Sequence, residues 1–152
     1  MGEFHVATVE APVLYDLRRR ILRGNDPRVA VDFELDDEPT ARHYAGLLDG
    51  SVVVSASFFS AVAPIRSELA SYQLRFMAVD VGLQGRGYGA LVLGVAEKEL
   101  RQLGAEQLWA NARDSALGFY IAVGFTTIEG SENVSPISNL PHTKIAKLLA
   151  PS

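Results

Sequence analysis

The sequence predicts an α/β fold in which a mixed sheet is flanked by helices. Apolar segments with the alternation of strands recur along the chain, and residues 89–103 carry the broad apolar face of an amphipathic helix. In addition, Asp49-Gly50 stands between two apolar runs, which is a strong signal for a β-hairpin. The chain has 152 residues, which fits one domain over residues 1–152.

The first half of the chain predicts a strand, a helix and a hairpin. Pro12 is suited to open the helix, and leucine and isoleucine side chains give it an apolar stripe. Four arginines occupy its remaining faces, where we expect a solvated face, with contact to phosphates or to an anionic acceptor as the alternative: Arg18, Arg19, Arg20 and Arg23. The expected elements are a strand at 4–9, a helix from Pro12 to the breakers at 24–27, an irregular segment at 28–40 and strands at 42–48 and 51–60.

The second half alternates strands with helices. Gly104 stands where a C-terminal cap belongs, and Gly124 ends a shorter helix in the same way. The expected elements are strands at 73–79, 107–113, 125–128 and 143–149, with helices at 89–103 and 115–123.

Composition excludes several classes of function. A net charge of −4 argues against a protein that binds nucleic acid. The absence of cysteine excludes disulfides and thiolate catalysis, and three histidines far apart in the sequence do not predict a metal site. The apolar stretch 52–63 is too short to span a membrane, and residues 1–10 lack an apolar signal core. We therefore expect a cytoplasmic protein with no metal and no membrane partner.

The most informative stretch for chemistry is residues 77–89. A strand ends there, glycines follow at alternate positions 85, 87 and 89, and a helix begins. Such glycines let backbone N–H groups converge on a ligand, and a helix N-terminus adds partial positive charge. This pattern indicates an anion site, most naturally for a phosphate or pyrophosphate, to which Arg86 could contribute a charged contact.

Two nucleotide-binding motifs fit this turn less well. A P-loop would require Gly-Lys-Ser/Thr, which does not follow. Gly85, Gly87 and Ala90 fit the dinucleotide pattern, but that pattern also needs an acidic residue at the carboxyl end of the next strand. Glu106 has the right spacing and lies at the opposite end of that strand.

Residues 84–89 match the Q/R-x-x-G-x-G/A signature of the GNAT superfamily of N-acetyltransferases, which the chain therefore resembles. Residues 119–125, Phe-Tyr-Ile-Ala-Val-Gly-Phe, resemble the F-Y-x-x-x-G-F segment of that family. Residues 74–79 and the pair Pro141-His142 resemble a subgroup of small bacterial GNAT proteins. The resemblance is strong over residues 72–128 and weaker outside them.

The resemblance implies a GNAT-type acyl-CoA N-acyltransferase fold, with a mostly antiparallel sheet that is splayed at its centre. It also implies acetyl-CoA as co-substrate, with the pantetheine arm bonded to the main chain of Met77 and Val79. Arg113 stands where such proteins often have a cofactor-contacting Asn, and it could meet a phosphate, the pantetheine carbonyl or the substrate. The pyrophosphate would rest on the backbones of Gln84, Gly85, Arg86, Gly87, Tyr88 and Gly89.

For catalysis, the resemblance implies direct attack of a primary amine on the thioester. Tyr120 corresponds to the usual acid for the departing thiolate, while His142 and Glu34 are candidates for the base. The acidic run 32–38 is ordinarily a solvated loop, but in GNAT proteins this segment often walls the acceptor site, where it would attract a cationic amine. A homodimer is common among similar proteins. The alternative is a GNAT-fold sensor that binds acyl-CoA without catalysis.

Overall fold

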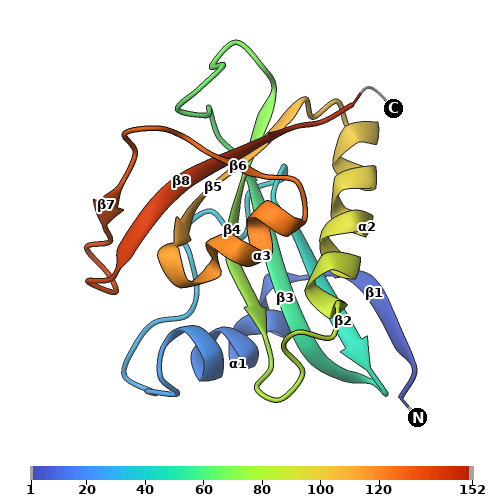
Figure 1. Cartoon of the computed structure of the whole chain (residues 1–152). Helices are drawn as coiled ribbons and strands as arrows, with labels where there is room; N and C mark the ends of the chain where they lie inside the picture. Colours follow the sequence, from blue (N-terminus) through green and yellow to red (C-terminus); the bar gives the residue numbers. More distant parts are fainter. Residues whose placement is uncertain (1, 151–152) are drawn as a thin grey trace. The chain divides into compact units, whose positions relative to one another are not determined.

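The computed structural model describes residues 2–150, which form two compact units (Figure 1). The first contains residues 2–59 and 74–100, and the second contains residues 60–73 and 101–150. The strands are β1 (Phe4–Val9), β2 (Arg42–Leu48), β3 (Ser51–Ser60), β4 (Ser71–Val79), β5 (Gln107–Arg113), β6 (Thr126–Thr127), β7 (Asn133–Val134) and β8 (Pro141–Leu148).

Hydrogen-bonded strands follow the order β1-β2-β3-β4-β5-β8-β6, and β7 pairs with β8. The pairs β1–β2, β2–β3, β5–β8, β6–β8 and β7–β8 are antiparallel, whereas β4 and β5 are parallel. The predicted mixed, mostly antiparallel sheet is therefore confirmed. The short strand β7 was not predicted, because two residues carry no readable alternation.

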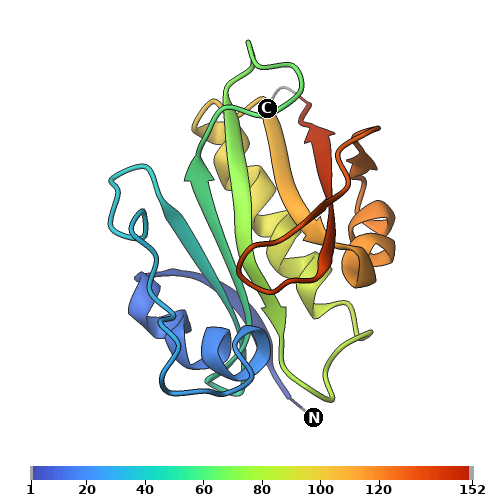
Figure 2. The same cartoon turned by 90° about the vertical axis from the view of Figure 1, so that its left-hand side faces the viewer.

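The helices of the first unit lie before β2 and after β4. Helix α2 (Tyr88–Gln102) was predicted at 89–103, and its buried face includes Val92, Ala96 and Leu100. The segment predicted as one helix from Pro12 is instead three short turns: η1 (Ala11–Leu14), α1 (Tyr15–Leu17) and the π-helical η2 (Arg18–Leu22). In Figure 2, α1 lies in front of the strands of the first unit, and α2 lies behind β4.

The arginines of this helical segment do not all lie in solvent as expected. Arg18 is buried, with 1% of its surface exposed, and its guanidinium reaches a carboxylate of the segment between η2 and β2. A charge on an otherwise apolar face can be buried when it is paired and hydrogen-bonded. The expectation of a fully solvated arginine face is therefore wrong at Arg18.

The hairpin between β2 and β3 forms at the predicted Asp49-Gly50 pair. Both residues have positive φ, 50° and 84°, as a two-residue turn of type I′ requires. The Asp49 carboxylate also accepts the N–H of Glu3 at 2.8 Å, which holds the chain before β1 against the turn. The hairpin brings Tyr44 and Phe58 into edge-to-face contact in the core of the first unit.

The second unit is built around the antiparallel pair of β5 and β8, whose register runs from Gln107↔Leu148 to Arg113↔His142. The first residues of β4 lie beside β5, and this parallel register, as far as the described residues go, ends at Gln73↔Trp109. The unit also contains η3 (Asp114–Ala116) and α3 (Leu117–Ala122), for which one helix was predicted at 115–123.

Candidate functional site

The glycine turn after β4 has the geometry that the sequence predicts. Gly82, Gly85 and Gly87 have φ values of 85°, 80° and 85°, a region that side chains other than glycine rarely adopt. A Cβ atom added at any of the three would meet nothing within 4 Å. Backbone conformation, rather than crowding, is therefore the reason for glycine at these positions, and the turn faces open space.

The backbone donors of this turn are available to a ligand. Within residues 2–150, the N–H groups of Gly85, Arg86 and Gly87 have no hydrogen-bond acceptor. Helix α2, which is 15 residues long, starts directly afterwards at Tyr88. The first N–H groups of a helix also lack partners inside the helix. Free backbone N–H groups and the partially positive N-terminus of α2 thus lie next to each other in the chain. This combination suits the binding of a phosphate or pyrophosphate.

Asp80 fixes the start of the turn, a role that the sequence analysis did not assign. Its N–H donates to the carbonyl of Val53 on β3 at 2.8 Å, and its carboxylate accepts from Arg20 at 2.9 Å and from the N–H of Val81 at 2.8 Å. The hydrogen bond from Arg20 is the main reason why the pKa of Asp80 lies below its usual value. An aspartate after a strand carries too little sequence signal to reveal this.

The other end of the turn is held by aromatic packing. The ring of Tyr88 stacks on that of Phe4 of β1, with centroids 4.4 Å apart and planes 19° apart. Gly89 is buried, and the Gln84 side chain donates to the carbonyl of Val79 at 3.2 Å. The ring of Tyr88 is therefore part of the packing against β1, and only the backbone of this residue would contact a ligand in the turn.

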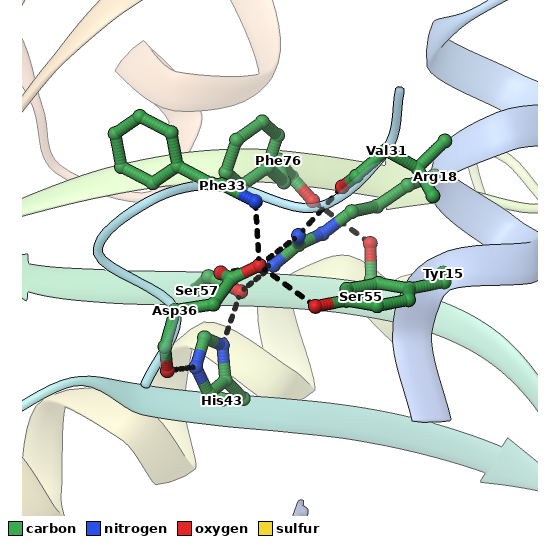
Figure 3. Close-up of polar contacts among 9 residues, drawn as sticks. All are labelled: Tyr15, Arg18, Val31, Phe33, Asp36, His43, Ser55, Ser57 and Phe76. Atoms are coloured by element: carbon green, nitrogen blue, oxygen red, sulfur yellow. Dashed lines mark hydrogen bonds and ion pairs between the residues drawn. The ribbon is translucent and has the colours of Figure 1, made fainter. Parts of the chain in front are cut away.

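A buried polar network joins η2 and the segment 24–41 to strands β2 and β3 (Figure 3). Arg18 donates from both terminal nitrogens to the carboxylate of Asp36, at 2.9 and 3.1 Å. It also donates to the Val31 carbonyl and to the Ser57 hydroxyl, each at 2.9 Å. Arg18 and Asp36 thus form a bidentate ion pair, and Arg18 makes additional hydrogen bonds. A buried ion pair needs such hydrogen bonds to offset the cost of removing its charges from water.

His43 completes the network. Its Nε2 lies 2.9 Å from the carbonyl oxygen of Asp36, which can only accept, so Nε2 carries the proton. In the neutral ring Nδ1 then accepts from the Ser57 hydroxyl at 2.7 Å. The network therefore ties β2 and β3 to the segment 24–41. The acidic run was expected to be solvated or to wall the acceptor site, and the expectation of a solvated side chain is wrong at Asp36, which is 5% exposed.

The ionisation of Asp36 reflects these contacts. Burial alone would raise its pKa, but the hydrogen bonds from Arg18 and from the N–H of Phe33 outweigh burial, and the pKa lies below its usual value. Tyr15 donates its hydroxyl to the same carboxylate at 3.2 Å, and burial together with the Asp36 charge raises the tyrosine pKa. At neutral pH the ionised carboxylate of Asp36 is therefore paired with the charged guanidinium of Arg18.

Strand β4 has an unusual backbone next to this network. Phe76 has φ of 58°, in the left-handed region that is rare for bulky residues. Its carbonyl accepts the Ser55 hydroxyl at 2.8 Å, and its ring lies under the Arg18 guanidinium at 4.1 Å (Figure 3). Such a conformation persists only where its surroundings hold it, and here a hydrogen bond and a cation–π contact do so.

In the second unit, the predicted acid Tyr120 lies on α3. Its ring packs edge-on against Phe119 and Phe125, at 5.2 and 5.6 Å. Only 6% of the residue is exposed, and this burial raises the pKa of the hydroxyl well above its usual value. No described residue forms a hydrogen bond with the hydroxyl. Tyr120 thus carries its proton at physiological pH, and the hydroxyl has no acceptor among the described residues.

Two further predicted site residues lie opposite each other. Arg113 at the end of β5 is the cross-strand partner of His142 at the start of β8. The His142 Nδ1 lies 2.8 Å from the carbonyl oxygen of Leu140, so Nδ1 carries a proton and Nε2 is the acceptor in the neutral ring. The third, Glu34, is exposed on a turn of the first unit, where the structure shows no ion pair with it among residues 2–150.

The comparison with known families decides what this fold is. The model of the acetyltransferase (GNAT) family matches residues 11–125, which is more than half of the chain. The chain belongs to the GNAT family. The expectation from the two short motifs is thereby confirmed, and acetyl-CoA is the co-substrate that members of this family use.

Relatives of this GNAT protein agree with the assignment. It is 28% identical over 134 residues to the uncharacterized N-acetyltransferase YitI of Bacillus subtilis strain 168, covering 88% of this chain and 90% of the relative. A putative N-acetyltransferase from Lactobacillus plantarum shares its fold with a TM-score of 0.74 and 16% identity, covering 97% and 99% of the two chains. An aminoglycoside 6'-N-acetyltransferase complexed with coenzyme A matches with a TM-score of 0.69 and 14% identity, covering 97% and 98%.

Two other kinds of site are absent from the described residues. Between residues 2 and 150, no cluster of three or more His, Cys, Asp or Glu side chains is placed to hold a metal ion. Nor does any helix in this range have the length and apolar character needed to cross a membrane. The predicted single domain, homodimer and cytoplasmic location of this GNAT protein stay predictions.

Proposed function

We propose that this protein is an N-acetyltransferase that moves the acetyl group of acetyl-CoA directly onto a primary amine. The observation that carries the proposal is the turn before α2, where the N–H groups of Gly85, Arg86 and Gly87 have no acceptor among the described residues. In a GNAT protein, this is the turn that would receive the pyrophosphate of the co-substrate.

Residues on and after β4, together with Arg113 on β5, are the ones that would bind acetyl-CoA. The backbones of Gln84 through Gly89 would hold the pyrophosphate, and the exposed Arg86 would add charge. Main-chain groups of Met77 and Val79 on β4 would hold the pantetheine arm. Arg113, which has no ion pair among residues 2–150, would meet a phosphate, the pantetheine carbonyl or the acceptor.

The bonds of the transfer balance without a redox partner or a metal. The amine nitrogen forms a bond to the thioester carbonyl carbon, the carbon–sulfur bond breaks, and the thiolate leaves. The Tyr120 hydroxyl, which has no acceptor among the described residues, would donate a proton to that thiolate. The amine must lose a proton, which either His142 through Nε2 or Glu34 would accept.

Calorimetric titration with acetyl-CoA tests the co-substrate site. Gly87→Trp places a large side chain at a residue with φ of 85° in the turn, and we expect it to abolish the saturable binding seen with the wild type. Gly130→Trp is the matched control, because Gly130 is exposed, has φ of 76° and also has open space around its Cβ position. This control should bind acetyl-CoA normally.

Assays of thiol release from acetyl-CoA then separate enzyme from sensor. Turnover with amines, reduced in Tyr120→Phe at unchanged acetyl-CoA affinity, would support catalysis. Tight binding with no turnover by any amine would favour the non-catalytic acyl-CoA sensor instead. Failure of the folded wild type to bind acetyl-CoA would overturn the proposed function and leave the glycine turn with a structural role.

A further inference from the structure

Arg75 on β4 is half-buried and has no counter-ion in the part of the chain that the structure describes. The carbon at the centre of its guanidinium lies 4.6 Å from the centroid of the Phe33 ring, and no hydrogen bond or ion pair accompanies this contact within residues 2–150. Removal from water lowers the pKa of Arg75 from its usual value, yet an arginine remains charged at neutral pH.

Two other arginines of the same unit that are buried or half-buried are paired with carboxylates. Arg18 is paired with Asp36, and Arg20 with both Asp16 and Asp80. Arg75 has five N–H donors, and none of them has an acceptor within residues 2–150. A cation–π interaction uses the face of the guanidinium and leaves its N–H edge open, and because the residue is only half-buried this edge is accessible to a ligand.

The ring beneath Arg75 is held in place by the network of Figure 3. The N–H of Phe33 donates to Asp36 at 2.9 Å, on the carboxylate oxygen that also binds Arg18. The Phe33 ring then contacts Phe59 edge-on at 5.1 Å and Phe76 at 5.5 Å. The Phe33 ring, which forms an aromatic platform, is therefore held both by its backbone and by its side chain. The Arg75 guanidinium stacked on this platform is ordered before any ligand binds.

We propose that Arg75 binds an anionic oxygen group, a carboxylate or a phosphonate, on the amine acceptor. The substrate class would then be amines that also carry such a group, as an amino acid does, and not polyamines. A guanidinium with a free edge matches the two oxygens of such an anion. The exposed acids Asp32 and Glu34 flank Phe33 in the sequence and would supply negative charge for the ammonium group of a zwitterion. This inference rests on the proposed acetyl transfer.

The test compares L-amino acids with the corresponding amino acid amides in the thiol-release assay, together with aminomethylphosphonate and a polyamine. Each amide keeps the amine and loses the negative charge. The two amines differ in basicity, so the quantity to compare between variants is the ratio of kcat/KM for acid over amide. We expect Arg75→Met to lower kcat/KM for the best acid about 10- to 100-fold and to change its amide little, as loss of a charge-assisted hydrogen bond implies.

Two variants serve as controls. Arg75→Lys keeps the charge and loses the planar fork, so it should restore part of the preference for the acid. Arg28→Met removes an exposed arginine that pairs only with Asp26 in the structure, and it should leave the ratio unchanged. If Arg75→Met does not fold, Phe33→Leu removes the aromatic platform instead, and the ratio should fall in the same direction.

The possible outcomes distinguish this inference from the proposed function. An acid-over-amide ratio that is the same in wild type and Arg75→Met would overturn the inference, and so would acetylation of the polyamine alone. Both results leave acetyl transfer intact. A loss of acetyl-CoA affinity in Arg75→Met, measured by calorimetry, would assign the arginine to the co-substrate and also overturn it. If wild type binds acetyl-CoA but acetylates none of the anionic amines, the inference is wrong as well.

Discussion

The Arg18 guanidinium and the Asp36 carboxylate meet at 2.9 and 3.1 Å, with only 1% and 2% of their side chains exposed. They join a helical turn to a segment that has no regular structure of its own. Because Asp36 also accepts the Phe33 N–H, the pair fixes the backbone that carries the Phe33 ring. The conformation of residues 31–36 thus depends on an arginine that lies 18 residues before Asp36.

Replacing Arg18 by Met should strongly destabilise the fold. The substitution leaves the Asp36 carboxylate buried without its counter-ion, and breaking a buried pair from one side costs about 3–5 kcal/mol. Urea denaturation should show this decrease in the free energy of unfolding. The exposed pair of Arg28 and Asp26 provides the comparison, and Arg28→Met should change stability little. Equal losses in the two variants would contradict the importance of the buried pair.

The stability of the protein should fall in acid, with a contribution from Asp36. Its pKa is lower in the folded state than in the unfolded chain, where an aspartate has a pKa of about 3.9. The ionised carboxylate therefore contributes stability above about pH 4, and this contribution is lost as the pH falls through the folded pKa. Unfolding free energies measured between pH 6 and pH 2 should decline less steeply in Asp36→Asn. An unchanged slope would show that other carboxylates dominate the acid transition.

Tyr120→Phe should separate chemistry from binding. If the hydroxyl protonates the departing thiolate, its removal should lower kcat by about 10²- to 10⁴-fold, the usual contribution of a general acid. The affinity for acetyl-CoA should not change. Tyr72→Phe is the control, because Tyr72 is a half-buried tyrosine to which no role is assigned. In alkaline absorbance titrations of the wild type, Tyr120 should ionise late because burial raises its pKa, and this late phase should be absent in Tyr120→Phe.

Two glycines at helix α2 should respond to alanine with opposite signs. Gly94 is exposed within the helix and has open space at its Cβ position, so Gly94→Ala should stabilise the protein by about 0.5–1 kcal/mol. Gly104 follows the helix with φ of 96°, so Gly104→Ala should destabilise it by about 1 kcal/mol or more. Thermal or urea unfolding measures both. Shifts of the same sign would contradict the assigned backbone conformations.

Asp80→Ala should weaken the use of acetyl-CoA without removing the site. The carboxylate binds Arg20 and the Val81 N–H, and thereby holds the start of the glycine turn. Losing these bonds should raise KM for acetyl-CoA by roughly 5- to 10-fold, as expected for about one hydrogen bond of ordering. Asp26→Ala removes an aspartate that is not bonded to the turn and should leave KM unchanged. A KM equal to wild type in Asp80→Ala would show that the turn is rigid without this anchor.

The sequence was sufficient for features that depend on local signals. Alternating apolar residues predicted β1, and two apolar runs flanking Asp49-Gly50 predicted β2, β3 and their hairpin turn. The glycine spacing predicted the turn before α2. Each of these features depends on side-chain periodicity or on residues that favour positive φ. Both can be recognised from a few neighbouring residues in the sequence.

Features that depend on distant partners were not predicted. Arg18 and Asp36 were both assigned to solvent, because a charged residue reveals its burial only when its partner is known. The left-handed backbone of Phe76 and the Phe33 platform for Arg75 were missed for the same reason. The roles of Tyr120, His142 and Glu34 came from the resemblance and await the kinetic tests.

The anchoring of Asp36 also bears on how this segment could be redesigned. Residues 37–40 are exposed, whereas Asp36 and His43 on either side of them are buried in the network. Insertions between the two anchors would not disturb the ion pair, and long surface insertions have a small entropic cost. Residues 37–40 are therefore a site for loop grafting, at which libraries of altered length could be introduced while Phe33 and Arg75 keep their arrangement.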